Sequence, residues 1–377
     1  MLITSSLDHT ARVWTPLVDR TGFRDLGYRL PPAPNKPGRS VYSVAIDPTG
    51  DRIAFSDQTS VYLQSSGQEP KALALDLGGD QIRPRFTQVL IRAPGEIIAS
   101  AVEPRLIVWT MMSDGAAWTA RTVALPGDSI PPGRSAALDP SGAMLAVEVR
   151  DGDQASILLC PLHGSQPWTC ATSGNSAVTK LPLDAKLALH PSDKDCAKSG
   201  SEVHVAVSKS GRLVAAGAGA CPIQVFDTRN PNTSRSYAGL DKDGGINSLD
   251  FSPDERAIVA ASQRWEVRVW DLAGGPSRNI SHHASPFVTA ARYSPSGQWI
   301  VSTSNDKTVV VSAAESGAKL VVLKYPNSLL DVVAASTPRG SMMATGSGTG
   351  DVNVMPLFEN AKDISPYVTA VLQDISQ

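Results

Sequence analysis

The 377-residue chain has few cysteines, no long apolar stretch and no recognisable leader. Its four cysteines, at positions 160, 170, 196 and 221, are too few for a disulfide-rich scaffold, and no C-x-x-C pair indicates zinc. No apolar run approaches the roughly 18 residues of a membrane span, and the N-terminus lacks the charged and apolar regions of a secretory signal. We therefore expect a cytoplasmic protein with reduced thiols and no membrane partner. A Cys160–Cys170 or Cys196–Cys221 bridge is the alternative if the protein is exported.

Charge of one sign and aromatic residues are also scarce. The 34 basic and 36 acidic residues leave a net charge of −2, and aromatics make up 6% of the chain. This composition gives neither the basic field nor the stacking residues that nucleic-acid binding needs, so no nucleic-acid partner is expected. What the chain has in quantity is 30 glycines and 28 prolines, which indicate many short elements joined by tight turns.

One short phrase recurs along the chain: an apolar run, a turn of the Asp/Ser-Pro-x-Gly type and a second apolar run. Proline presets the first φ of such a turn, and glycine supplies the positive φ that closes it. The flanking runs alternate in the manner of half-buried strands. Five of the six spacings between turns lie between 42 and 47 residues and one is 69, which matches four-stranded propeller blades. The seven copies are residues 43–56, 89–101, 135–148, 205–217, 248–262, 290–304 and 334–347.

A third strand follows each pair and often ends in a large hydrophobe, as in VRVWD at residues 267–271. With these residues the chain resembles the WD-repeat β-propeller family, of a bacterial type, and we expect it to be a module of a larger protein. The resemblance implies an all-β fold in which residues 1–377 form one propeller of four-stranded blades.

An eighth copy is divided between the two ends of the chain. Residues 365–377 (SPYVTAVLQDISQ) resemble the first strand and turn at 285–297 (SPFVTAARYSPSG), and residues 1–14 supply a second and third strand. We therefore expect eight blades, the first split between 1–30 and 366–377, with the C-terminal strand innermost. Seven blades is the alternative. The long spacing marks an insertion at 163–202, and residues 15–40 are either a surface recognition strip or an outer strand (RDLGYRL) with a linker.

His283, Ser304 and Asp306 contain the ingredients of a Ser-His-Asp triad. The resemblance implies another use, a structural tetrad in which a His before the first strand bonds a turn Asp, with Ser302 or Ser304 as the hydroxyl. Asp8 and Trp14 fill the corresponding positions in the terminal copy. No nucleophile elbow or metal-binding spacing accompanies them, so we expect no enzyme activity, no metal and no cofactor.

The resemblance implies a non-catalytic protein–protein interaction or sensing scaffold. Its partner would be a protein, a peptide or another domain of the same polypeptide, held on a propeller face. The alternative is a propeller-class hydrolase or lactonase with a site in the channel. Turn position and residue type select the binding candidates, and Trp168 stands out as an aromatic anchor that could instead seal an outer hairpin. The candidates are His9, Trp168, Arg264, Trp265, Asn305 and Lys307.

Overall fold

The computed structural model describes most of the chain between residues 39 and 359. For three N-terminal strands it describes the backbone. The described ranges are 2–5, 11–14, 28–29, 39–65, 68–75, 85–92, 95–101, 105–112, 117–126, 135–151, 154–162, 168–170, 178–183, 202–219, 221–238, 240, 245–285, 287–338, 340–357 and 359.

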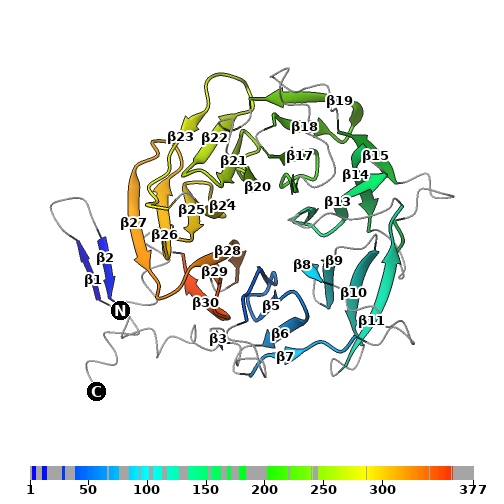
Figure 1. Ribbon diagram of the computed structural model, residues 1–377, viewed down its shortest axis with the longest axis horizontal. Coiled ribbons are helices and arrows are strands. Elements are labelled where there is room, and N and C mark those ends of the chain that lie inside the picture. Colours follow the sequence, from blue (N-terminus) through cyan, green and yellow to red (C-terminus); the bar gives the residue numbers. More distant parts are fainter. Residues whose placement is uncertain are drawn as a thin grey trace.

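Seven four-stranded antiparallel sheets stand as blades around a central axis (Figure 1). Within each blade the strands run in order from the axis to the rim. Blades 1 to 3 consist of β4 (Ser43–Ile46), β5 (Arg52–Ser56), β6 (Val61–Ser65) and β7 (Lys71–Ala72); β8 (Phe86–Arg92), β9 (Glu96–Ala101), β10 (Arg105–Met111) and β11 (Trp118–Ala124); and β12 (Ala136–Leu138), β13 (Met144–Asp151), β14 (Gln154–Pro161) and β15 (Thr179–Pro182).

Blades 4 to 7 follow in chain order. They consist of β16 (Val203–Val207), β17 (Leu213–Ala218), β18 (Ile223–Asp227) and β19 (Asn230–Tyr237); β20 (Ile246–Phe251), β21 (Ala257–Ser262), β22 (Val267–Asp271) and β23 (Arg278–Asn279); β24 (Val288–Tyr293), β25 (Trp299–Ser304), β26 (Thr308–Ala313) and β27 (Lys319–Lys324); and β28 (Leu329–Thr337), β29 (Gly340–Ser347), β30 (Asp351–Pro356) and β3 (Tyr28–Arg29). The all-β propeller of four-stranded blades predicted from the sequence is confirmed.

The ring closes through the N-terminal strand β3. Each inner strand contacts the next around the ring, and β28 contacts β4, so the circle is complete with seven blades. Tyr28 pairs with Val352 and Arg29 with Asp351, which makes β3 the outer strand of blade 7. The outer-strand interpretation of RDLGYRL thus holds at these two residues.

The expectation of eight blades is wrong, because the N-terminal repeat-like hairpin stands outside the ring. Among the described strands, β1 (Leu2–Ser5) and β2 (Ala11–Trp14) pair only with each other, and β2 lies beside β27 (Figure 1). The C-terminal strand that was to join them, residues 366–377, lies outside the described residues. Closure therefore uses an N-terminal outer strand where a C-terminal inner strand was expected.

The turns between the first and second strands are built as their residues dictate. Gly50, Gly142, Gly211 and Gly297 have φ between 68° and 79°, the conformation that glycine adopts without a Cβ clash. In blade 5 Glu255 takes this position with φ 60°, and its carboxylate accepts hydrogen bonds from the Ser210 backbone and hydroxyl of the preceding blade.

The hydrophobic core is divided among the seams between blades. At the seam that closes the ring, Phe55 of blade 1 and Val41, just before its first strand, pack against Met342 and Val352 of blade 7. All four are at most 1% exposed. Alternate side chains of each strand reach opposite seams, so every sheet is buried on both faces. Folding therefore depends on each blade finding both neighbours.

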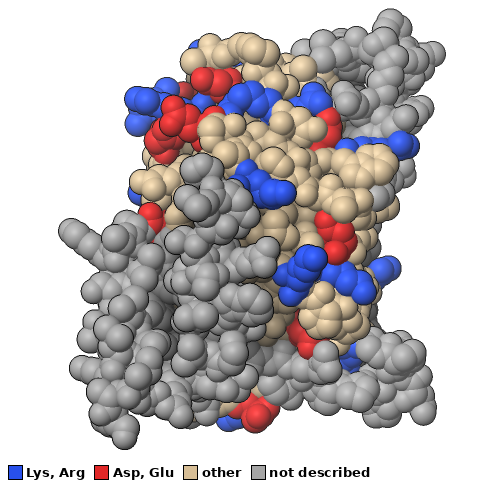
Figure 2. Space-filling view, turned by 90° about the vertical axis from the view of Figure 1, so that its left-hand side faces the viewer, with Lys and Arg blue, Asp and Glu red and all other residues tan. Residues whose placement is uncertain are grey.

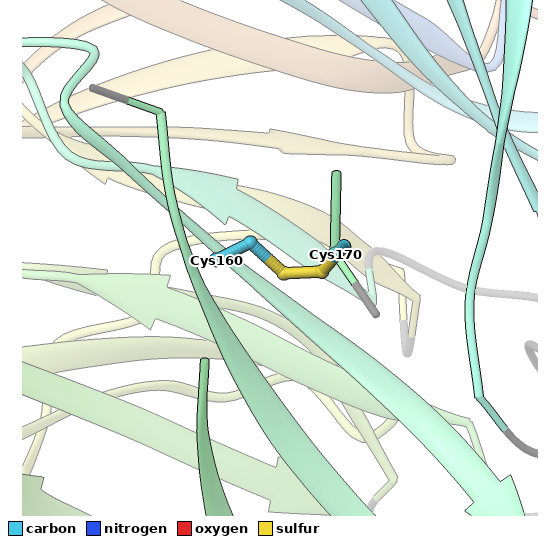
Figure 3. The surroundings of a disulfide bond; sticks show 2 residues. All are labelled: Cys160 and Cys170. Atoms are coloured by element: carbon cyan, nitrogen blue, oxygen red, sulfur yellow. A yellow bond between two sulfur atoms is a disulfide. The ribbon is translucent and has the colours of Figure 1, made fainter. Parts of the chain in front are cut away.

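The insertion at 163–202 contributes part of blade 3. Its residues 179–182 form β15, the outer strand, and Cys170 is disulfide-bonded to Cys160 of β14 (Figure 3). Cys221 is also disulfide-bonded, whereas Cys196 lies outside the described residues. The expectation of reduced thiols is wrong for the three described cysteines, and the Cys160–Cys170 bond joins the insertion to β14.

Candidate functional site

One end of the ring carries the turns between the second and third strands, and we call it the upper face. Four of these turns are fully described, at residues 57–60, 262–266, 304–308 and 347–351. In each, a side-chain oxygen on the turn's first residue accepts backbone N–H bonds of the same turn. The bonds run from Thr59 and Ser60 to Asp57, from Arg264 and Glu266 to Ser262, from Asp306 to Ser304, and from Thr349 and Asp351 to Ser347.

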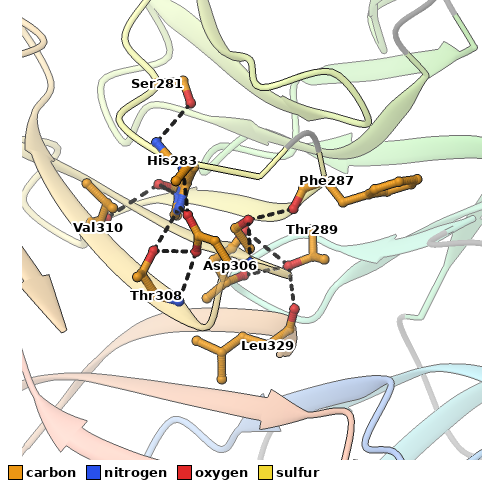
Figure 4. A network of polar contacts seen from close by, with 12 residues as sticks. Ser281, His283, Phe287, Thr289, Asp306, Thr308, Val310 and Leu329 are labelled. Carbon is orange, nitrogen blue, oxygen red and sulfur yellow. Dashed lines mark hydrogen bonds and ion pairs between the residues drawn. The ribbon is translucent and has the colours of Figure 1, made fainter. Parts of the chain in front are cut away.

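His283 occupies the centre of a polar network beneath the turn at 304–308 (Figure 4). Its Nδ1 lies 3.2 Å from Asp306 Oδ2 and 3.0 Å from Thr308 Oγ1, and its Nε2 lies 2.8 Å from Ser302 Oγ. Asp306 also accepts the backbone N–H groups of Ala284 and Thr308, at 2.8 and 3.0 Å. The network therefore ties the segment before β24 to β25 and to the turn.

Burial and hydrogen bonding set the charge states of this pair. Burial lowers the pKa of His283, and the neighbouring Asp306 carboxylate offsets only part of that effect. Burial acts to raise the pKa of Asp306, but hydrogen bonds from Thr308 and Ala284 outweigh it, and the pKa lies below its usual value. The geometry is that of an anionic Asp306 bonded to a neutral His283.

Asp306, His283 and Ser302 are bonded in the order of a nucleophilic triad. These side chains are too deeply buried for a substrate to reach them. The His283 side chain is 0% exposed and Ser302 is 3% exposed, so no substrate carbonyl reaches the hydroxyl. Ser304, the other hydroxyl considered from the sequence, donates to the Phe287 carbonyl at 2.7 Å and accepts the Asp306 N–H. The arrangement can hold a turn and a strand together.

Trp265, Lys307 and Gly350 occupy the same position in the turns of blades 5, 6 and 7. Their φ angles are 58°, 69° and 90°, all in the left-handed region. Glycine is the residue suited to this conformation, and a side chain there costs about 1 kcal/mol. Trp265 nevertheless occupies it, with 47% of its surface exposed.

The other rim candidates have separate places. Arg264 and Asn305 are exposed in their turns, and Asn305 N–H donates to the Phe287 carbonyl at 3.1 Å. Trp14 is the last residue of β2, where its backbone pairs with Leu2, and Asp8 and His9 lie outside the described residues.

Trp168 is not the exposed anchor considered from the sequence. It is 5% exposed and packs in the cluster that contains both cysteines of the disulfide. Its Nε1–H donates to Glu96 at 3.0 Å, and the Arg121 guanidinium lies 4.9 Å from its ring centre. Trp168 therefore seals the seam between blades 2 and 3, which is neither the exposed anchor nor the outer-hairpin position considered from the sequence.

Two exposed aromatics on the upper face were missed in the sequence. Phe287 is 45% exposed and directly precedes β24, and its ring points away from the His283 network (Figure 4). Tyr42, which directly precedes β4, is 37% exposed. The signal was available, because an aromatic directly before or within the approach to an inner strand sits at the ring's upper end.

The described residues contain no group of three or more His, Cys, Asp or Glu side chains placed to hold a metal ion. Within them, too, there is no helix of the length and apolarity needed to cross a membrane. On the side shown in Figure 2, basic and acidic residues are interspersed among uncharged ones.

Comparison with known proteins agrees with the fold. The WD40 family model (WD domain, G-beta repeat) matches residues 235–271 and 274–311. Each match begins in or beside the outer strand of one blade and continues through the three inner strands of the next, so the sequence repeat is offset from the blade by one strand. The chain thus carries WD40 repeats, as its sequence pattern predicted.

Partial similarity extends to three animal proteins. The chain is 30% identical over 135 residues to the Xenopus tropicalis U3 small nucleolar RNA-associated protein 15 homolog, covering 35% of this chain and 25% of that protein. It is 28% identical over 104 residues to transcription initiation factor TFIID subunit 5 of Caenorhabditis elegans (27% and 15%), and 27% identical over 138 residues to pre-mRNA-processing factor 19 of the same nematode (36% and 27%). The matches thus span about a quarter or less of these relatives. They support a WD-repeat propeller and give no support to a bacterial type.

Proposed function

We propose that this propeller is a non-catalytic binding module that holds a protein or peptide on its upper face, with Trp265 as the central contact. The fold and the WD40 repeats support a protein-interaction scaffold in general. The choice of face and residue is carried by one observation, the exposed Trp265 side chain in the left-handed position of its turn.

The conformation of Trp265 favours a role outside folding. Gly350 fills the same position in blade 7 and avoids the cost of about 1 kcal/mol that a side chain incurs there. A residue that keeps a strained conformation while about half of its surface is exposed points to function. Tryptophan is also the residue type most enriched among the energetic centres of protein interfaces.

The surroundings of Trp265 suit a partner with apolar and acidic groups. Arg264 and Lys307 are exposed on neighbouring turns, and Phe287 adds a second exposed ring at the upper end of β24. The acidic side chains of these turns, Asp306 and Glu266, are mostly buried, at 10% and 6% exposed. This mixture of cations and aromatics over blades 5 and 6 would complement an acidic peptide that carries an apolar side chain.

The partner is proposed to be a protein, a peptide or another domain of the same polypeptide, and the name of one relative, a TFIID subunit, describes a component of an assembly. We infer no nucleic-acid contact from the near-neutral charge of the chain. We also propose that the propeller acts as a sensor. This requires that binding of the partner to the upper face change in response to a signal.

The disulfide bears on where the protein folds. Both Cys160 and Cys170 are 0% exposed, so their bond is enclosed in the core between blades 2 and 3. Disulfides of this kind form in oxidising compartments. We infer that the chain folds in such a compartment, in place of the cytoplasm expected from its sequence.

Affinity capture from an extract of the source organism tests the choice of face. The chain would be immobilised as wild type, as Trp265→Ala, as Lys307→Glu and as Met112→Ala. Met112, 45% exposed and distant in sequence from the upper-face turns, is the matched apolar control. We expect a protein retained by wild type and Met112→Ala and lost with both upper-face variants. Equal retention by all four, or loss with Met112→Ala alone, would overturn the proposal.

A further inference from the structure

Two asparagines lie exposed in the outer strands of blades 4 and 5, and we propose that both, Asn232 and Asn279, are N-glycosylation sites. The inference rests on the residues that follow each asparagine and on the place of the two side chains in the structure. It also rests on the oxidising compartment that the proposed function infers from the Cys160–Cys170 bond, because oligosaccharides are attached in such a compartment.

Both asparagines stand in the pattern Asn-x-Ser/Thr, with a middle residue other than proline. Residues 232–234 read NTS and residues 279–281 read NIS. This is the pattern at which an oligosaccharide is attached to the asparagine side chain, provided that it lies at the surface. The chain has ten asparagines, and the other eight lack Ser or Thr at the second following position. The place of these two in the fold therefore decides whether the pattern can be used.

Asn232 lies in an irregular part of β19 that is open to solvent. The register between β18 and β19 shifts there, so that residues 231–233 have no partner on β18. The Thr233 hydroxyl donates to the Asn230 carbonyl at 3.1 Å, which closes this bulge on itself. Asn232 and Ser234 are both exposed. The acceptor amide and the hydroxyl of the motif are thus accessible while the blade stays folded.

Asn279 is the last residue of β23, where it pairs with Arg268. Its side-chain oxygen accepts the backbone N–H of Ser281 at 3.1 Å. This bond turns the chain at the end of the strand and holds the asparagine side chain beside the residue that carries the hydroxyl. Ile280, the middle residue, is 6% exposed and packs in the core, whereas Asn279 is exposed. The middle residue therefore anchors the motif and leaves the asparagine at the surface.

Both strands lie on the outside of the ring (Figure 1). Among the described strands, β19 and β23 are the last of their sheets. An outer strand presents backbone N–H and C=O groups that can pair with another chain, and proteins cover or interrupt such edges. A bulky, hydrophilic glycan on each strand would cover these two edges without entering a seam between blades.

The chain supplies the acceptor and no other reactant. The asparagine side-chain nitrogen forms a bond to the anomeric carbon of an oligosaccharide carried on a lipid pyrophosphate. The bond between that carbon and the pyrophosphate oxygen breaks, and the lipid pyrophosphate leaves with the electron pair. The nitrogen loses one proton to the transferase, and nothing is oxidised or reduced.

Peptide mass spectrometry of the full chain from its natural source tests both sites. Treatment with peptide N-glycosidase in water labelled with heavy oxygen converts each glycosylated asparagine into a labelled aspartate, and a sample without the enzyme controls for deamidation. We expect label at Asn232 and Asn279 and none at Asn230, an exposed asparagine of the same strand outside the motif. An unlabelled Asn232 or Asn279 would overturn the assignment of that site.

The state of the Cys160–Cys170 bond in the same sample separates this inference from the one beneath it. Unlabelled asparagines with an intact bond would overturn the glycosylation sites and leave the oxidising compartment standing. Unlabelled asparagines with reduced cysteines would overturn both.

Variants of the hydroxyl residue, expressed in cells of the source organism, test the motif without changing either asparagine. We expect Ser234→Ala to lose the glycan on Asn232 and Ser281→Ala to lose the glycan on Asn279. The matched controls Ser234→Thr and Ser281→Thr should keep both glycans, because threonine also completes the motif. A glycan that persists in an alanine variant would contradict the assignment, as would its loss in the corresponding threonine variant.

Discussion

The buried carboxylate of Asp331 accepts the backbone N–H of Val44, 287 residues earlier in the chain, at 3.0 Å. Asp331 lies on the inner strand of blade 7 and Val44 on that of blade 1, so this bond crosses the seam that closes the ring. Ser43, Gln88 and Ser248 occupy the same position in their blades and accept the N–H of the next inner strand, at 2.9 to 3.1 Å. The propeller is thus closed by the same kind of bond that joins blades 1 and 2, blades 2 and 3, and blades 5 and 6.

Removing this acceptor should destabilise the protein. Asp331→Ala leaves the buried Val44 N–H without its partner, which costs about 1–3 kcal/mol, whereas Asp331→Asn retains an acceptor oxygen and should cost less. Urea unfolding at neutral pH measures both. Ser248→Ala is the control at an interior seam. If Asp331→Ala were as stable as wild type, the closing bond would contribute nothing to the ring.

The His283 network should act on stability and not on turnover. Asp306→Ala removes the acceptor for His283, Ala284 and Thr308, so we expect a loss of about 1–3 kcal/mol in the free energy of unfolding. Ser302→Ala removes one bond to His283 and should cost less. An Asp306→Ala protein with unchanged melting but an abolished hydrolytic activity would show that the network is catalytic.

Glu148 should make the stability depend on pH near neutrality. Its side chain is 0% exposed beside Arg150, and burial raises its pKa to about 7 from an ordinary 4.5, against the effect of the Arg150 charge. Because the folded state binds the proton more tightly, the stability from this group is complete below pH 4.5 and is lost as the pH rises through 7.

Glu148→Gln removes that titration. Relative to this variant, wild type should lose on the order of 3 kcal/mol between pH 4.5 and 8. Unfolding free energies of the two proteins at several pH values across this range measure the difference. Parallel curves for wild type and Glu148→Gln would exclude a raised pKa.

The Cys160–Cys170 bond closes a short loop, with ten residues of separation, that delivers Trp168 into the seam. Replacing both cysteines by alanine should lower the free energy of unfolding by about 3 kcal/mol through the entropy of the unfolded loop. Thiol titration of denatured, unreduced wild type should detect neither cysteine. Reactive thiols at both positions in protein isolated from its natural source would restore the cytoplasmic expectation.

The repeat predicted most of this fold, because a turn with proline and glycine between alternating strands is a local signal. All seven predicted strand pairs lie in the seven blades. The blade count failed at the N-terminal strands, because residues 1–14 have the sequence pattern of a blade although β1 and β2 lie outside the ring. The closing strand β3 pairs through two residues, too few for a periodic pattern.

The sequence predicted which residue types form the candidate site, but it predicted less well which of these side chains are buried. Ser302 and Ser304 lie on the same side of β25, and the sequence could not tell which hydroxyl meets His283. Trp168 is of a residue type typical of exposed binding anchors, but the neighbouring disulfide and its hydrogen bond to the salt-bridged Glu96 place it in the core. The positions of Tyr42 and Phe287 directly before inner strands place them at the upper face, but the sequence pattern does not give how far each ring is exposed.

The most direct test of the account is to measure stability and partner binding together in Trp265→Gly. Glycine relieves the left-handed conformation, so the melting temperature should stay equal to that of wild type or rise, while affinity for the captured partner should fall at least tenfold. If the variant bound the partner as tightly as wild type, Trp265 would not be the contact that holds the partner on the upper face. If the variant melted well below wild type, Trp265 would serve the fold.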